Sequence, residues 1–438
     1  MIKQTHTELL NIVGELETLP ADTYTVQQAV NLLGFGWFHV KLSLFVGLCW
    51  MADSMEMTIL SIIGPTTQCE WNISTYQKAF MTTIVFLGMI ISPSFWTQLS
   101  DRYGRKSALT FCGVLLVLYS LLSSVAPTFT WLIILRALVG FSIGCIPQSV
   151  TLYAEFLPSK HKGKCVILMD CFWALGACFE IALALAIYPN FGWRWLLGFS
   201  TAPLLLFTSL TPIAKDNNRQ MLIGRLTSDY EANPPHQLKT LFKPELRKIT
   251  LILWFLWMSC AFCYYGLVLI SAEVFLSDNV KALPSQNCSS FNTKDFMDLM
   301  WITFSEFPGI FLTIAVIKRH GKKKTMASEF IIFSVCMSIL SLSKSRIYTT
   351  SVLFLARGVI SGLFQAAYIY TPDIYPNNLR SLGVGGCSTI ARLGAMATPF
   401  VSQVLFQSSA SSAFMVYTSI GLLSAVACII LPESQILI

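Results

Sequence analysis

Charged residues are scarce in this chain of 438 residues. Asp, Glu, Lys and Arg together form 12% of it, whereas a soluble domain carries about 25%. Hydrophobic residues form 54% of the chain, and its mean hydropathy is +0.61. The core of a soluble domain cannot hold so large an apolar surplus, so part of it must face lipid. The composition therefore excludes the soluble globular classes and predicts an all-α membrane protein that crosses the bilayer many times.

Motifs for catalysis and for cofactors are also missing. The sequence has no Gly-x-x-x-x-Gly-Lys-Ser/Thr segment that would cradle nucleotide phosphates, and no Cys or His cluster with the spacing of metal ligands. It has no catalytic constellation and no nucleic-acid motif, although its net charge is +7. We therefore predict no enzyme activity, no cofactor, no metal and no nucleic-acid partner. The surplus of basic residues is better explained by the loops that carry them.

Twelve apolar runs have the length of about 20 residues that a spanning helix needs. The first run begins late and is too long for a secretory signal, so all twelve are taken as spans. The predicted spans are 40–63, 77–99, 107–125, 130–152, 164–188, 193–212, 249–276, 296–317, 325–343, 348–371, 381–406 and 411–431.

Polar segments divide the chain around these spans. Residues 1–39 predict a cytoplasmic arm with an amphipathic surface helix that begins near Thr25 and ends near Gly34. The other predicted units are a six-span half, a cytoplasmic linker with an Asn-Pro-Pro segment, a second six-span half and a short cytoplasmic tail: 40–212, 213–248, 249–431 and 432–438.

Basic residues indicate the orientation of the chain in the membrane. Most of the 30 Lys and Arg residues fall in the arm, in the linker and in the loops on the same side as these two segments. Short loops rich in Lys and Arg remain in the cytoplasm. Both termini are therefore predicted to be cytoplasmic. The opposite side has few basic residues: Lys78, Arg194, Lys281, Lys294, Lys344 and Arg346.

Two loops on the opposite side carry candidate modification sites. Most of the 13 cysteines lie in apolar runs, where Cys behaves as a small hydrophobe. Cys69 and Cys288 instead fall in these two loops, so a disulfide between them is one option and two free thiols are the other. Asn72 and Asn287 begin Asn-x-Ser triplets in the same loops and are candidate glycosylation sites, although such triplets also occur by chance.

An internal repeat relates the two halves. Residues 153–163 match 370–381, and Leu-Gly-Ala at 175–177 matches Leu-Gly-Ala at 393–395 with nearly the same offset. Gly104 and Gly321 correspond in the same way, as do Arg136 and Arg357. Parallel repeats of six helices about an axis along the membrane normal are a known transporter plan, with the substrate site at midplane between the halves.

Three motifs carry a family resemblance. Asp101-Arg-Tyr-Gly-Arg-Lys106 follows the second span, Arg136-Ala-Leu-Val-Gly140 lies in the fourth, and Tyr153-Ala-Glu-Phe-Leu-Pro158 follows the fourth. This set resembles the signature of the major facilitator superfamily, which implies twelve transmembrane helices in two six-helix halves.

Further segments narrow the resemblance, which covers about residues 22–434. They are similar to the family of synaptic vesicle 2-related proteins, largely orphans, which lies beside the organic ion transporters and the sugar porters. These segments are Trp50–Glu56, Gln148–Glu155, Tyr264–Gly266, Ser305–Gly309 and Gln365–Pro372.

The resemblance also implies a cytoplasmic gate. Arg102 and Arg105 in the motif that begins at Asp101 would reach Glu155 while the cytoplasmic side is closed, and these salt bridges would break as it opens. In the second half, Lys318 stands where the first half has the Asp, so the matching contacts must come from three other residues: Arg319, Lys322 and Asp373.

Charges within spans need partners, because an ionised side chain at the bilayer centre costs about 2.5–3.5 kcal/mol or more. Asp53 and Glu56 lie three residues apart in the first span and share a helix face. Two carboxylates that close resist being ionised together, which suits a proton carrier. In proton-coupled sugar porters a first-span Asp pairs with the fourth-span Arg, so the resemblance implies that Asp53 pairs with Arg136. The alternative is a permanently ionised pair that only holds two helices together.

Arg392 is the candidate that bears on substrate charge. In organic ion transporters the matching position is acidic where cations are carried and Arg where anions are carried, so the resemblance implies an anionic or zwitterionic substrate. Alternatively, Glu306 neutralises Arg392 inside the protein. Asp170 and Arg357 also fall within spans, unless they lie near helix ends and reach the interface.

Polar aromatic side chains in the second half are candidates for the wall of a substrate cavity. Tyr264 and Tyr265 lie in the seventh span, and Gln365 and Tyr368 lie in the tenth. Their rings and hydroxyl or amide groups suit a flat organic molecule. The alternative is that they form lipid-facing aromatic belts.

The sequence thus favours a secondary active transporter that moves a small organic ion, anionic or zwitterionic, by alternating access, with proton coupling as an option. The competing hypothesis is a transport-inactive receptor or scaffold protein of vesicle membranes. The predicted partners are the lipid bilayer, the organic ion and protons. We expect a multi-pass monomer in an intracellular vesicle membrane or in the plasma membrane.

Overall fold

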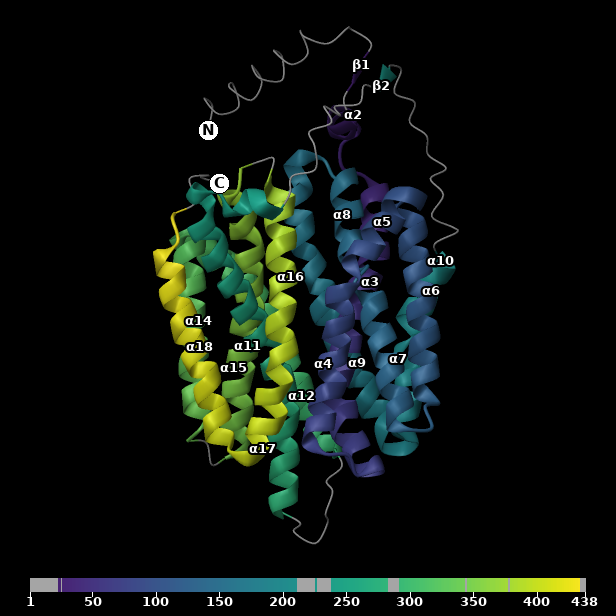
Figure 1. Cartoon of the computed structure of the whole chain (residues 1–438), viewed down its shortest axis with the longest axis vertical. Helices are drawn as coiled ribbons and strands as arrows, with labels where there is room; N and C mark the ends of the chain where they lie inside the picture. Colours follow the sequence, from purple (N-terminus) through teal and green to yellow (C-terminus); the bar gives the residue numbers. More distant parts are fainter. Residues whose placement is uncertain are drawn as a thin grey trace.

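The computed structural model describes residues 23–24, 26–210, 225–226, 238–282, 291–342, 345–376 and 379–433. Within these residues the fold is a bundle of helices that follow the twelve predicted spans in order (Figure 1). The first half contains α3 (Trp37–Trp71), α4 (Thr75–Ile91), α5 (Pro93–Tyr103), α6 (Arg105–Ser124), α7 (Phe129–Ile143), α8 (Pro147–Phe156), α9 (Ser159–Ser200) and α10 (Ala202–Leu210).

The second half has the same number of spans. It contains α11 (Pro244–Ala282), α12 (Thr293–Phe304), α13 (Glu306–His320), α14 (Lys322–Leu340), α15 (Arg346–Ile374), α16 (Arg380–Pro399), the π-helical turn η3 (Phe400–Leu405), α17 (Phe406–Ser408) and α18 (Ala410–Ile430).

Short elements lie outside the spans. The amphipathic helix expected in the arm is α2 (Val26–Leu33), which ends before Gly34, a residue with φ of 67°. Strand β1 (Thr23–Tyr24) pairs in parallel with β2 (Arg225–Leu226), so a segment before the first span meets one from the predicted linker. The 3-10 helix η1 (Leu238–Phe242) leads into α11.

Helix breaks have local causes in the sequence. Pro93 occupies the first turn of α5, and α5 is bent by 42° from α4 because proline donates no backbone hydrogen bond. Gly192 interrupts α9 with φ of 78°, a left-handed value that favours glycine. The fifth and sixth predicted spans therefore share one assigned helix, divided at Gly192, and α10 completes the sixth.

The two halves pack by the same scheme. In the first half α3 lies against α9, α4 against α7, and α6 against α7 and α10. In the second half α11 lies against α16, α13 against α15, and α14 against α15 and α18. Each pair in the first half has its counterpart six spans later, so the packing confirms the two six-helix halves predicted from the repeat.

Two glycines explain why the Leu-Gly-Ala segment is repeated. A Cβ atom at Gly176 would overlap the backbone carbonyl of Met51 on α3, and one at Gly394 would overlap the carbonyl of Met258 on α11. In each half, the fifth helix thus lies against the backbone of the first helix, which only glycine permits.

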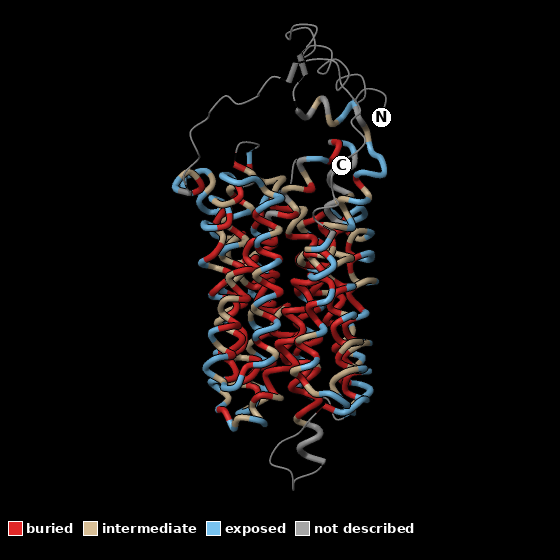
Figure 2. The backbone as a smooth tube through the Cα atoms, turned by 90° about the vertical axis from the view of Figure 1, so that its right-hand side faces the viewer, coloured by how far each residue is buried: buried red, intermediate tan, exposed pale blue. Residues whose placement is uncertain are grey.

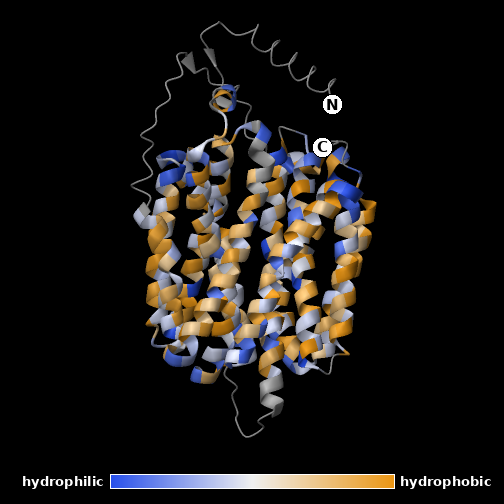
Figure 3. Cartoon of the chain, turned by 180° about the vertical axis from the view of Figure 1, so that it is seen from behind, coloured by the Kyte–Doolittle hydropathy of each residue, from blue (hydrophilic) through white to orange (hydrophobic). Residues whose placement is uncertain are grey.

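The exterior and the ends of the bundle differ in polarity. Hydrophobic residues cover the middle of the helices, and hydrophilic residues collect near both ends (Figure 3). Buried residues concentrate in the interior (Figure 2). We call the end where α3 begins and α18 ends the termini end, and the end where α3 finishes at Trp71 and α4 begins at Thr75 the far end.

Contacts between the halves are distributed unevenly. Helix α4 lies against α16, and α9 lies against α12. Several hydrogen bonds cross this boundary between the middle of the bundle and the far end, among them Trp173–Tyr264, Arg392–Met89, Thr83–Met396, Lys78–Glu273 and Thr75–Gln407. The halves are thus fastened together at the far end.

Candidate functional site

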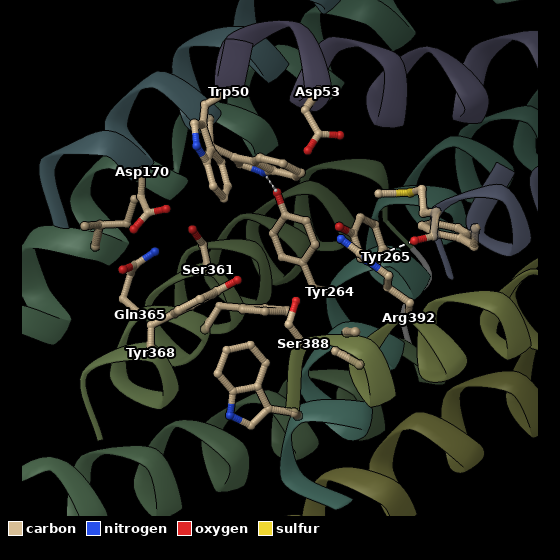
Figure 4. A pocket seen from close by; sticks show the side chains of 18 residues that line it. Trp50, Asp53, Asp170, Tyr264, Tyr265, Ser361, Gln365, Tyr368, Ser388 and Arg392 are labelled. Atoms are coloured by element: carbon tan, nitrogen blue, oxygen red, sulfur yellow. Dashed lines mark hydrogen bonds between the residues drawn. The ribbon is translucent and has the colours of Figure 1, made fainter. Parts of the chain in front are cut away.

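A cavity of about 110 Å³ lies between the two halves (Figure 4). Helices α3, α4 and α9 of the first half and α11, α13, α15 and α16 of the second contribute to its wall. Most of the lining is aromatic or aliphatic, with a few convergent polar groups, which is the usual form of a small-molecule site. The polar side chains other than tyrosine and tryptophan are Asp53, Asp170, Ser361, Gln365, Ser388 and Arg392.

The cavity brings together most of the residues predicted to bind a substrate or a proton. Six of them line it: Asp53, Tyr264, Tyr265, Gln365, Tyr368 and Arg392. These aromatic side chains therefore face the interior and do not form lipid-facing belts. Glu56, Arg136 and Glu306 are not part of the lining and are buried within the two halves.

The predicted pairing of Asp53 with Arg136 is wrong. Arg136 Nη1 donates to Glu56 Oε2 at 2.8 Å, and the Ser120 hydroxyl donates to Glu56 Oε1 at 2.5 Å. The pair is almost fully buried inside the first half. A separation of three residues turns two side chains by about 60° around a helix, which is enough for Glu56 to point into the half while Asp53 points into the cavity.

The alternative in which Glu306 neutralises Arg392 is also wrong. Arg357 Nε donates to Glu306 Oε1 at 2.6 Å inside the second half. The Tyr264 hydroxyl donates to the same carboxylate oxygen at 2.9 Å and accepts a hydrogen bond from Trp173 Nε1 at 2.6 Å. Glu306 therefore lies behind the cavity wall, where it binds Arg357 and holds the lining residue Tyr264 in place. Arg357 is buried and does not lie at the membrane interface.

Arg392 spans the boundary between the halves. Its Nη1 atom donates to the backbone carbonyl of Met89 on α4 at 2.7 Å. The guanidinium also interacts electrostatically with Asp53 and with the Tyr265 and Tyr368 hydroxyls. The part of the chain that the structure describes holds no carboxylate in direct ion pairing with Arg392, so much of its charge remains directed into the cavity.

Asp53 is buried, yet within the described part of the chain it lacks the hydrogen bonds that usually accompany a buried carboxylate. It is 6% exposed, and its Oδ1 atom has no hydrogen-bond partner among the described residues. Its electrostatic neighbours are Arg392, which favours an ionised carboxylate, and Glu56, which opposes one. A buried polar atom left unpaired is costly and often marks a functional site.

Sequence reasoning missed several lining residues, including Trp50, Trp173 and Ser388. Asp170 was identified only as an intramembrane charge. A usable signal existed, because Trp50 and Asp53 on α3 are three residues apart, as are Asp170 and Trp173 on α9. Since α3 and α9 pack together, two acid–tryptophan pairs at helical spacing indicate a shared polar and aromatic surface.

A buried ion pair joins the halves on the far-end side of the cavity. Lys78 Nζ on α4 lies 2.6 Å from Glu273 Oε1 on α11, and both side chains are less than 10% exposed. The Thr75 hydroxyl on α4 also donates to Gln407 Oε1 at 2.6 Å. From the sequence, Lys78 was expected only to be one of the few basic residues on the opposite side, and Glu273 had no predicted role.

The predicted gate residues lie at the termini end. Lys322 donates to Asp373, which joins α14 to α15 within the second half. Asp101, Arg102 and Arg319 are exposed. The side chain of Glu155 lies outside the described residues, so its predicted contacts with Arg102 and Arg105 remain predictions.

Two of the predicted modification sites, Cys69 and Asn72, lie at the far end. Cys69 is disulfide-bonded, and its expected partner, Cys288, lies outside the described residues, as does Asn287. Asn72 caps α3 in a left-handed conformation and is exposed, which leaves its side-chain amide accessible. Within the described residues no group of three or more His, Cys, Asp or Glu side chains is arranged to hold a metal ion.

Two six-helix halves with a cavity between them are the architecture of one class of membrane transporters. The chain belongs to the major facilitator superfamily, because its sequence matches the Major Facilitator Superfamily over residues 45–281 and 295–436. Within it, the chain is similar to the synaptic vesicle 2-related protein of Rattus norvegicus, with 44% identity over 94% of this chain and 81% of that protein. Both family resemblances inferred from the sequence motifs are thereby confirmed.

More distant relatives agree with this assignment. The organic cation/carnitine transporter 7 of Arabidopsis thaliana is 34% identical over 86% of this chain and 88% of that protein. The inward open conformation of the xylose transporter XylE from E. coli superposes with a TM-score of 0.71 and 14% identity, covering 91% of this chain and 97% of that one. This structural match supports the fold, but at 14% identity it carries no information about the substrate.

Proposed function

We propose that the chain is a secondary active transporter that moves a small organic ion across a membrane by alternating access. The observation that carries the proposal is the central cavity, which is lined from both halves and holds Arg392. A site shared by two halves becomes accessible from one side or the other when the halves rock around it. No catalytic role is assigned to any residue.

Arg392 supports an anionic or zwitterionic substrate. A guanidinium in a cavity of low dielectric attracts a carboxylate, sulfonate or phosphate and can bind it through two hydrogen bonds. Because Arg392 is anchored to the Met89 carbonyl through one nitrogen, its other nitrogens remain for a ligand.

Asp53 supports proton coupling. When ionised, Asp53 competes with a bound anion for the Arg392 guanidinium; when protonated, it releases that charge. Other groups that act on Asp53 include Glu56 and the Cys49 thiol on its own helix and the hydroxyls of Tyr265 and Tyr368. Proton binding at Asp53 and anion binding at Arg392 are therefore expected to favour each other.

Two sets of contacts support gating. Lys78 and Glu273 close the far end, while Arg102, Arg105 and Glu155 are proposed to close the termini end in the opposite state. Lys322 and Asp373 in the second half are already paired while the far end is closed, so closure of the termini end is expected to depend on the first-half residues. The distribution of Lys and Arg supports a cytoplasmic termini end. We further propose that the protein acts as a monomer, in an intracellular vesicle membrane or in the plasma membrane.

Uptake by the purified protein in liposomes tests the proposal. The probes are a pool of radiolabelled organic anions, zwitterions and cations, offered with and without an imposed pH gradient. Saturable accumulation of an anion or zwitterion, lost in Arg392→Gln, is expected. Binding of an ion without any movement across the membrane, under all gradients, contradicts transport and favours the receptor or scaffold alternative.

A further inference from the structure

Asp170 is a titratable group in the cavity that the mechanism above does not use. It lies on α9, on the opposite side of the cavity from Arg392, and faces Gln365 and Ser361 on α15 (Figure 4). Its electrostatic neighbours are the Gln365 amide and the distant Glu306 carboxylate. No Lys or Arg among the described residues forms an ion pair with it.

The cavity therefore has two regions that differ in their ionisable groups: one holds a cation and a carboxyl group, and the other holds a carboxyl group alone. At one side Arg392 faces Asp53, so a positive and a negative charge offset each other in part. At the other side Asp170 brings a carboxyl group that has no cation beside it among the described residues. A carboxylate in a largely apolar wall strongly favours a positively charged partner, because its hydration shell is incomplete.

Aromatic rings line the same cavity as Asp170. Trp50 and Trp173 pack edge to face with ring centroids 5.8 Å apart, and Trp257 and Tyr368 do so at 4.5 Å. The indole N–H of Trp50 has no hydrogen-bond partner among the described residues. Aromatic rings and a carboxylate in one cavity suit an alkylammonium group, which they can bind through cation–π and ionic attraction together.

We propose that the cavity binds an organic zwitterion, with its ammonium group at Asp170 and the aromatic rings and its acidic group at Arg392. The inference rests on the proposed role of the cavity as the substrate site and makes that role more specific. The ligand must be small, because the cavity holds about 110 Å³, and its two charges must be separated so that they reach opposite walls.

Binding by matched probes tests the inference. Thermal shift of the purified protein is measured with ω-amino acids of increasing chain length and their trimethylammonium derivatives, each beside the carboxylic acid and the amine that lack one of the two charges. We expect at least one zwitterion to bind about tenfold or more tightly than both of its matched halves, since hydrogen bonds between charged groups are stronger than those between neutral groups.

Two variants test which residue binds each end of the ligand. Asp170→Asn should reduce zwitterion affinity to that of the matched acid, and Arg392→Gln should reduce it to that of the matched amine. Glu329→Gln is the control, because Glu329 is a buried carboxylate bonded to Thr313 and outside the cavity lining. That variant should keep the full preference.

The outcomes separate this inference from the proposed function. A panel in which no zwitterion binds better than its acid and its amine overturns the inference, as does an Asp170→Asn protein that keeps its preference for the amino group. If either of these results is found but the protein still takes up simple acids in liposomes, the proposed transport function stands and only the zwitterion inference fails. Zwitterion binding that depends on Asp170 without uptake supports the inference and contradicts transport.

Discussion

Lys78 and Glu273 form an ion pair that joins the two halves of the bundle inside the far end, with 2.6 Å between Nζ and Oε1. The pair differs from Arg194–Glu70, which lies at the same end but within the first half and is more than a third exposed on both sides. Exposed pairs contribute little to stability. The buried pair connects the halves themselves, so it bears on which end of the cavity is closed.

Breaking this pair is expected to open the far end. Either Lys78→Met or Glu273→Gln leaves a buried charge without its partner, which costs about 3–5 kcal/mol when one partner is removed. A cysteine introduced at Thr82, which is buried on α4, should then react at least tenfold faster with an impermeant maleimide supplied at the far end. The parent protein provides the background rate of the native cysteines.

Two controls make the result specific. Arg194→Gln should leave the labelling rate unchanged, because its pair lies within one half. The exchanged variant, Lys78→Glu with Glu273→Lys, should restore slow labelling. Labelling as slow in the single variants as in the parent would show that the pair does not hold the far end closed.

Asp53→Asn is expected to uncouple transport from protons. The amide cannot gain or lose a proton, so accumulation driven by a pH gradient should be lost, whereas exchange of substrate on the two sides should continue at a comparable rate. The measurement is uptake and counterflow in liposomes at several external pH values. Glu329→Gln is the control, since it removes another buried carboxylate and should retain both activities. Loss of both activities in Asp53→Asn would indicate a structural role.

The fold was predictable because its determinants are local. The length of each apolar run sets a span, Pro93 and Gly192 set breaks, and the repeated glycines at Gly176 and Gly394 allow close contacts between helices. These features depend on short stretches of chain. They also depend on the bilayer, in which a spanning segment must satisfy its own backbone hydrogen bonds and therefore forms a helix.

The partners of the buried charges were not predictable in the same way. Asp53 and Glu56 are close in sequence, but a rotation of about 60° around α3 decides which of them meets Arg136 and which faces the cavity. The Lys78–Glu273 pair joins residues far apart in sequence, from both halves. Such pairs depend on how the halves pack, which short sequence patterns do not encode.

The Glu56–Arg136 pair is expected to act in stability rather than in coupling. Arg136 is fully buried, and its Nε and Nη2 atoms have no partner among the described residues. Glu56→Gln and Arg136→Met should each lower the free energy of unfolding by about 3–5 kcal/mol, while the double variant should lose much less than the sum. Unfolding in mild detergent measures the cycle. Strictly additive losses would show that the two charges do not depend on each other.

Arg392 is expected to set the sign of the substrate's charge at its end of the cavity. Removing the guanidinium in Arg392→Gln leaves Asp53 and Asp170 as the charged groups of the lining, so the field in the cavity becomes negative. Organic anions should then bind at least tenfold more weakly, because a charge-assisted hydrogen bond contributes about 1.5–3 kcal/mol. Cations of equal size should bind more tightly than before. Arg392→Lys keeps the charge but not the paired hydrogen bonds, so its affinity for anions should lie between those of the parent and of Arg392→Gln, which separates the charge from the geometry of the guanidinium. Thermal shift with matched organic anions and cations measures both effects, and an unmodified protein that is stabilised by cations alone would refute the assignment.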